Sequence, residues 1–172
     1  IFRWSGSAWD SGTKLVASDA AASDFFGFSV SVSGDVVVVG SRFDDDGGSA
    51  SGSAYVFRWS GSAWDSGTKI VASDAAASDQ FGFSVSVSGD VVVVGSRFDD
   101  DGGTSSGSAY VFRWSGSAWD SGTKLVASDA ASFDEFGISV SVSGDVVVGA
   151  YGDESYTGAA YIFRWSGSAW DS

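Results

Sequence analysis

The 172-residue sequence contains no cysteine, histidine, proline or methionine. Without cysteine there is no disulfide framework and no thiolate metal site, and without histidine the commonest general base and transition-metal ligand is missing. Most familiar hydrolase and zinc chemistry is therefore excluded, and we expect no enzymatic activity. The absence of cysteine leaves the compartment open, because a secreted protein with a sufficient β core needs no disulfides.

Positive charge is also scarce. Nine lysines and arginines stand against 22 acidic residues, which gives a net charge of −13. Nucleic acid is excluded as a partner, since binding to its phosphates depends on lysine and arginine. There is no apolar run of transmembrane length and no signal-peptide pattern, so membrane insertion is not expected. With no initiating methionine, we expect the chain to be a processed product or an excerpt.

What the sequence does contain is a repeat. The segment Phe-Arg-Trp-Ser-Gly-Ser-Ala-Trp-Asp begins at residues 2, 57, 112 and 163, which are spacings of 55, 55 and 51. A fixed period of this length indicates an array of supersecondary units. The last interval is shorter because the valine run and the acidic loop that follows it both lose residues.

Within each unit the pattern indicates β-strands. Residues 28–33 alternate between apolar residues and serine, and 36–39 is a continuous valine run, which predicts a half-buried strand followed by a central one. Residues 54–59 and 63–73 are expected to form the third and fourth strands around a Ser-Gly-Ser turn. Lys69 suits an outer edge strand, where a charge opposes aggregation.

Four antiparallel strands in about 55 residues match one blade of a β-propeller, so we predict an all-β, propeller-type array of about three repeats. A β-solenoid or repeat filament is the alternative fold. The predicted units are the end of a preceding blade (1–24), two whole blades (25–79 and 80–134) and an incomplete blade (135–172). Because residues 1–11 and 162–172 are identical, we expect the array to continue past both ends, in the same chain or in another copy.

Each unit carries a Phe-Gly pair before the alternating strand and a further glycine after the valine run. The motif residues are Phe26, Gly27 and Gly40, then Phe81, Gly82 and Gly95, then Phe136, Gly137 and Gly149. We expect the phenylalanines to lie in the core between blades and the glycines to permit close backbone approach. Asp24, Asp79 and Asp134, just before the pair, are expected to cap the turn that enters the inner strand.

This pattern resembles the FG-GAP repeat over essentially the whole chain, and it looks more like the bacterial and algal branch than the integrin α-chain branch. The resemblance implies extracellular or surface-attached propellers that bind ligands and partner subunits, often with calcium in an Asp-rich loop between the first two strands. Here that connection is only residues 33–35, which is too short to wrap a cation. The family calcium site is therefore not carried over, and the proline of the Gly-Ala-Pro motif is missing throughout.

Carboxylates gather instead in glycine-rich loops after the valine runs. They are Asp44, Asp45, Asp46, Asp99, Asp100, Asp101, Asp153 and Glu154. Calcium prefers several oxygen ligands on a flexible backbone, which makes these loops candidate calcium sites. The competing interpretation, which we favour because the third unit loses the triplet, is a solvated turn whose aspartates bond backbone amides. No other cofactor is indicated. Arg42 and Arg97 precede the triplets and are expected to pair with nearby acids.

Two tryptophans flank each Ser-Gly-Ser turn, including the pairs Trp59 and Trp64, and Trp114 and Trp119. Repeated aromatic rings can form a platform for a glycan ligand. The interpretation that we favour is that the two rings pack across the hairpin.

The function expected from these observations is a non-catalytic extracellular structural or adhesion scaffold, located outside the cell or on its surface. The alternatives are a glycan-binding, lectin-type propeller and a subunit of a repetitive extracellular filament. The expected partners are further copies or further repeats of the same protein, and an extracellular protein or a glycan as ligand. Paired carboxylates could serve a glycosidase, but nothing in the sequence raises a carboxylate pKa.

Overall fold

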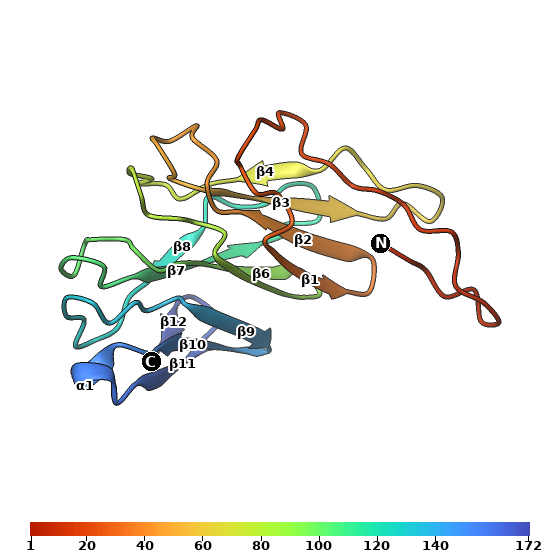
Figure 1. The fold of residues 1–172 in the computed structure, drawn as a ribbon. Coiled ribbons are helices and arrows are strands. Elements are labelled where there is room, and N and C mark those ends of the chain that lie inside the picture. The colour runs from red at the N-terminus through yellow and green to blue at the C-terminus, as the bar shows by residue number, and fades with distance from the viewer.

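The computed structural model describes residues 1–172 as three four-stranded antiparallel sheets that stand side by side in an open row (Figure 1). This confirms the predicted all-β array of four-stranded blades. The first blade contains β1 (Ser29–Ser33), β2 (Val36–Ser41), β3 (Ser53–Arg58) and β4 (Thr68–Ile70). The second contains β5 (Ser84–Ser88), β6 (Val91–Ser96), β7 (Ser108–Arg113) and β8 (Thr123–Leu125). The third contains β9 (Ser139–Ser143), β10 (Asp145–Ala150), β11 (Ala159–Trp165) and β12 (Trp170–Asp171).

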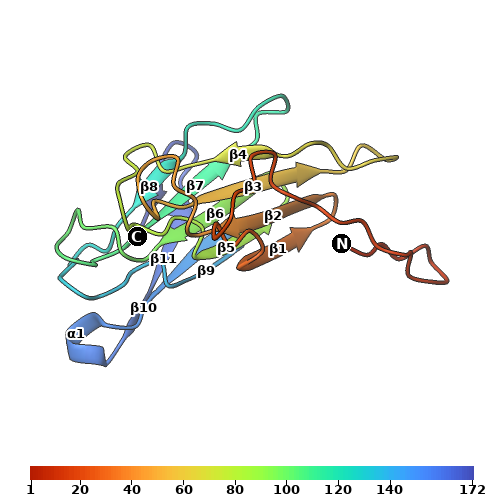
Figure 2. The same cartoon turned by 45° about the horizontal axis from the view of Figure 1, so that its top comes forward.

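Strand order follows chain order in every blade, as expected for strands joined by hairpins. The valine strand β2 is central and buried along its whole length, as the sequence predicts. The turn between β1 and β2 is tight, because Ser33 pairs directly with Val36. The first strands of successive blades, β1, β5 and β9, lie next to one another (Figure 2), which is the place of the inner strands of a propeller.

The predicted fourth strand was wrong in its length. β4 covers only Thr68–Ile70, whereas the prediction began at residue 63. The chain turns before it, because Gly67 has a φ of +81° and its N–H donates to the Asp65 carboxylate. Residues 59 and 64 meet only through an isolated bridge. A local aspartate turn therefore replaces the first half of the expected strand.

The third blade reaches its four strands in a different way. Its last strand, β12, pairs with the end of β11 through Trp165 and Trp170, which correspond to the bridged pair Trp59 and Trp64 of the first blade. The fourth strand of the third sheet therefore stands at the position of the tryptophan bridge and not at that of β4. The one helix, α1 (Asp153–Tyr156), is a single turn with positive φ at Glu154 and Ser155. No helix here has the length and apolar character needed to cross a membrane.

Adjacent blades bury apolar faces against each other. The core between the first two blades contains Val38, Val56, Phe81, Val92 and Phe112, all nearly inaccessible to solvent. The next interface repeats this arrangement around Phe136, which is also fully buried. Phe26, in the first blade, is half-buried. The expected role of the motif phenylalanines as interblade core residues is thus seen at both interfaces.

The motif glycines allow the backbones of adjacent blades to touch. A Cβ atom added to Gly40 would lie 2.0 Å from the carbonyl oxygen of Gly82 in the next blade, and one added to Gly82 would lie 2.2 Å from the carbonyl oxygen of Ser53. Ser29 Oγ donates a hydrogen bond of 2.8 Å to the same Gly82 carbonyl. The predicted close approach is therefore present here. At Gly27, by contrast, an added Cβ would meet no atom within 4 Å.

This difference allows a matched test of the interblade contact. Gly27 and Gly82 have similar φ values of +94° and +87°, so alanine costs roughly 1–2 kcal/mol of backbone strain at either position. Only Gly82→Ala also forces backbone atoms apart, so we expect it to lower the free energy of unfolding by at least about 2 kcal/mol more than Gly27→Ala. Urea denaturation of both variants measures this difference, and equal losses would contradict the structural role of the contact.

Candidate functional site

The aspartate triplet of the first blade does not converge on one point. Asp44 is buried, and its carboxylate accepts hydrogen bonds from the Asp46 N–H at 3.1 Å and from Ser53 Oγ at 3.0 Å. Asp45 turns the other way and accepts the Ala50 N–H at 2.7 Å, which closes the loop. The central aspartate of the triplet therefore stabilises its own turn, as the turn interpretation expects.

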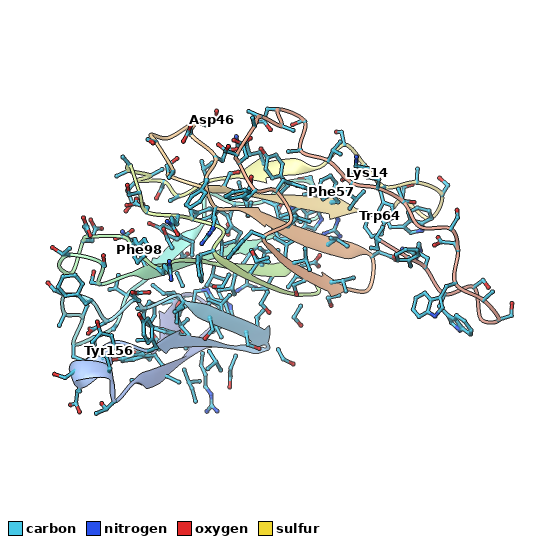
Figure 3. All side chains as sticks on the ribbon, in the orientation of Figure 1. Lys14, Asp46, Phe57, Trp64, Phe98 and Tyr156 are labelled. Carbon is cyan, nitrogen blue, oxygen red and sulfur yellow. The ribbon has the colours of Figure 1, made fainter.

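Asp44 and Asp46 meet a third carboxylate, that of Asp19, around the side chain of Lys69. The Lys69 Nζ lies 2.8 Å from an oxygen of Asp19 and 2.8 Å from one of Asp44, and it also contacts Asp46. The hydroxyl of Tyr55 lies next to the Asp19 and Asp44 carboxylates. Figure 3 labels Asp46 in the loop beside β4. One lysine thus joins the edge strand, the acidic loop and the segment before the blade.

The second blade repeats this acid–lysine cluster. Lys124 Nζ lies 2.8 Å from Asp74 and 2.8 Å from Asp99, and it also pairs with Asp101. Asp100, like Asp45, bonds to its own loop, through the Ser105 N–H. In the third blade the corresponding acids, Asp129 and Asp153, lie around the Tyr161 hydroxyl at 2.7 and 3.1 Å, and Glu154 lies on the surface in α1.

The cluster holds its lysine and carboxylates in their charged states and its tyrosine in the neutral state. Burial alone would lower the pKa of Lys69, but hydrogen bonds to Asp19, Asp44 and Asp46 raise it above the ordinary value. A hydrogen bond from Lys69 lowers the pKa of Asp19. Burial would raise the pKa of Asp44, but a second hydrogen bond from Lys69, together with those from the Asp46 N–H and Ser53, lowers it. Burial, followed by the bond to Asp19, raises the pKa of the Tyr55 hydroxyl.

Two groups of three carboxylates each converge on a point of their own: Asp19, Asp44 and Asp46 in one group, and Asp74, Asp99 and Asp101 in the other. In each case that point lies against a lysine ammonium, so these carboxylates do not fit a calcium ion while the lysine is in place. The sequence analysis missed Asp19, Asp74 and the role of the two lysines. These residues recur at the 55-residue period, which indicated a shared role. Their contact, however, depends on the pairing of Tyr55 with Lys69 across β3 and β4.

The tryptophans pack as pairs across the hairpins. The rings of Trp59 and Trp64 lie 5.5 Å apart, and those of Trp114 and Trp119 lie 5.4 Å apart. An arginine from an earlier part of the chain covers one ring of each pair: Arg3, before the first blade, lies 4.4 Å from the centroid of Trp59, and Arg58 of the first blade lies 4.5 Å from that of Trp114. The geometry is that of the packing interpretation, with cation–π contacts added.

The same arginines also form ion pairs, one of them between two blades. Arg58 lies 3.3 Å from Asp90, and Arg3 lies 2.9 Å from Asp35. These aspartates occupy the tight turn between the first two strands of the following blade. The guanidinium therefore bridges an acid and an aromatic ring of its neighbour, a partly exposed contact of the kind worth about 1 kcal/mol.

The expected local pairing of Arg42 and Arg97 with the acidic triplets was wrong. Arg97 pairs with Glu135 of the next blade at 3.4 Å, whereas Arg42 lies over the rings of Phe28 and Phe43. The lysines of the edge strands take the place that the sequence analysis gave to these arginines. They reach the triplets because β4 and β8 pair beside the loops, which no local pattern shows.

The capping aspartates behave as predicted. Asp24, Asp79 and Asp134 are buried and accept the N–H of the residue three positions earlier, at 2.7, 2.8 and 2.7 Å. At the second of these, burial and the nearby charges of Asp99 and Asp100 raise the pKa of Asp79 to about 6, against the bond from Ala76. This carboxyl therefore titrates between its ordinary range and neutrality.

We expect Asp79→Asn to change the pH dependence of stability. Because the folded-state pKa of Asp79 is raised, the stability contributed by its neutral form is complete below about pH 4 and is lost as the pH rises through about 6. Asparagine keeps the acceptor for the Ala76 N–H and does not ionise. The variant should match the wild type near pH 4 and exceed it by roughly 1–3 kcal/mol at pH 7. Denaturation between pH 4 and 7 tests this, with Asp171→Asn controlling for the lost charge; identical pH profiles would contradict it.

We expect the double variant Lys69→Met, Lys124→Met to lose stability, because each change leaves a buried aspartate without its counter-ion, at a cost of roughly 2–4 kcal/mol per site. Calcium in the millimolar range should then restore part of the melting temperature, since the emptied triads offer oxygen ligands. The matched control is Lys14→Met, at the equivalent but exposed position. A variant that gains nothing from calcium over chelator would show that the triads are not latent cation sites.

Comparison with known proteins agrees with this architecture. A family model described as FG-GAP repeat matches residues 9–57, 64–112 and 119–163, so each match begins at the second tryptophan of a hairpin and runs into the third strand of the following sheet. No curated protein matches the sequence. The three matches cover most of the chain. The contact between Gly40 and Gly82 explains why the motif has glycine at these positions, since a Cβ atom would not fit at either. This chain belongs to the FG-GAP repeat family.

Proposed function

We propose that the chain is part of a non-catalytic extracellular scaffold with a structural or adhesive role. The observation that carries the proposal is that its reactive side chains are engaged in holding blades together. Lys69 and Lys124 each tie an edge strand to an acidic loop and to the segment that leads into the blade, and Arg58 ties one blade to the next.

The titration behaviour of these groups supports a non-catalytic role. A general acid or base works best with a pKa near the operating pH. Within the acid–lysine clusters the pKa of Lys69 is raised and that of Asp19 is lowered, so both move away from neutrality. Asp79 titrates nearer to neutrality, but its carboxyl group is buried and accepts a hydrogen bond from a backbone N–H.

The tryptophan geometry favours the scaffold over a lectin. A glycan platform needs an open ring face, whereas arginines from earlier parts of the chain lie over Trp59 and Trp114. An extracellular setting is supported by the family, whose repeats are typical of extracellular proteins.

The location can be tested on intact cells of the source organism. We expect a membrane-impermeant amine reagent to label the native protein, because the exposed Lys14 offers a free amine, while a cytosolic protein in the same cells stays unlabelled. Labelling only after lysis would contradict the proposal. Turnover of chromogenic esters, phosphates or glycosides by the purified chain would contradict its non-catalytic part.

A further inference from the structure

Arg42 has no polar partner, although acidic residues outnumber basic ones by more than two to one in this chain. Its guanidinium carbon lies 3.9 Å from the ring centroid of Phe28, 4.4 Å from that of Phe43 and 5.5 Å from that of Phe83 in the next blade. Its Nε is buried without a hydrogen-bond partner. The aromatic rings attract the guanidinium cation, but they offer no oxygen or nitrogen acceptor to its N–H groups.

The second blade shows the same position with an anionic partner, although the Nε of Arg97 is also buried without a hydrogen-bond partner. Arg97, one repeat later, lies between Phe83 and Phe98 at 4.0 and 4.1 Å and pairs with Glu135 at 3.4 Å. The residue one repeat before Glu135 is Gln80. A neutral amide therefore stands opposite Arg42 where a carboxylate stands opposite Arg97.

Gln80 is itself left unsatisfied, because its Oε1 is buried without a hydrogen-bond partner. The first two units are nearly identical, and Gln80 is one of the few residues that differ between them. With Gln80 in place of the glutamate that the third unit carries at position 135, the guanidinium of Arg42 has no anionic partner and the Gln80 Oε1 has no donor at the junction of two blades. A buried polar group without a partner costs about 1–3 kcal/mol, which binding of a complementary group recovers.

The surroundings of Arg42 are apolar and partly open. Phe28 is 45% exposed and Phe25 is 54% exposed. The ring of Phe25 packs on Phe43 at 5.3 Å, and the ring of Phe28 packs on Phe83 at 5.2 Å. Figure 3 labels Phe98, which continues this row toward the third blade. A cation framed by exposed rings suits an anionic group that has an apolar neighbour.

The charge of the whole protein limits the ligand. With a net charge of −13, a polyanion such as a polyuronate is repelled at long range. A ligand with a single carboxylate avoids most of this repulsion. Arg97 also lies near Arg42, but it is paired with Glu135, so Arg42 is the cation that an arriving carboxylate meets.

We propose that Arg42 binds the carboxylate of an acidic side chain in a short peptide segment, while the Gln80 side chain rotates to bring its Oε1 to the surface and accepts a backbone N–H of the segment, and an adjacent apolar side chain packs on Phe25 and Phe28. The unpaired acceptor on Gln80 favours a peptide, which always carries an N–H donor. The guanidinium fork matches a carboxylate in bidentate geometry. The proposal deepens the adhesive role and rests on it for its biological setting.

The test uses the full chain labelled with ¹⁵N-arginine and titrated with acetyl-Phe-Asp-Phe-amide, followed through the Nε–H signals. We expect the Arg42 signal to shift saturably, with a dissociation constant of about 1 mM or tighter, and the uncharged acetyl-Phe-Asn-Phe-amide to bind at least about tenfold more weakly. Equal responses to the two peptides, or no shift at Arg42, would overturn the proposal.

Two variants separate binding from folding. Gln80→Glu copies the arrangement of Glu135 and supplies Arg42 with an internal carboxylate, so it should keep the fold and reduce peptide affinity at least about tenfold. Arg97→Gln, the matched control, should retain more of the affinity than Arg42→Gln. Unchanged affinity in Gln80→Glu would refute the site, and tighter binding of trigalacturonate than of the peptide would refute the ligand class. Because these measurements use purified protein, they are independent of the cell-labelling test of location.

Discussion

A close backbone approach between blades, in which Gly40 lies beneath the carbonyl of Gly82, is the constraint on which the rest of the structure depends. No other residue type fits at either position, because any Cβ would lie about 2 Å from a neighbouring oxygen. This contact fixes how far apart two sheets stand. At that distance Phe81 is fully buried against the adjacent blade. The two glycines of the family motif, which lie far apart in one repeat, are thus partners across neighbouring repeats.

Once the blades are fixed in this way, their charges come into register. Arg58 reaches both an aspartate and a tryptophan of the next blade, and Lys69 reaches Asp19, which precedes its own blade by a loop. A strongly acidic chain can therefore use its few cations as ties between elements. Individually such pairs contribute little, but the one that includes buried Asp44 neutralises a charge that would be costly to bury alone.

The near identity of the repeats turns small differences between them into informative ones. Phe25, Gln80 and Glu135 occupy one position of the repeat, and this position faces the arginine of the preceding unit where Arg97 meets Glu135. The acid–lysine cluster, by contrast, repeats without change in the first two blades. Variation is therefore found at a junction between blades, where it alters the pairing of an arginine without disturbing the core.

The sequence by itself determined the blade. The alternation in residues 28–33, the valine run after it and the 55-residue period are local or periodic signals, and local hydrogen bonding of strands follows from them. Even the capping role of Asp79 could be inferred, since the N–H that donates to its carboxylate is three residues away. Only the tertiary structure decided which charges meet. Asp19 and Lys69 are 50 residues apart, and their contact depends on the register of β3 with β4 and on the spacing of the sheets. The unpaired state of Arg42 depends on the next blade in the same way, because a side chain finds its partner through packing between units rather than through its neighbours in the chain.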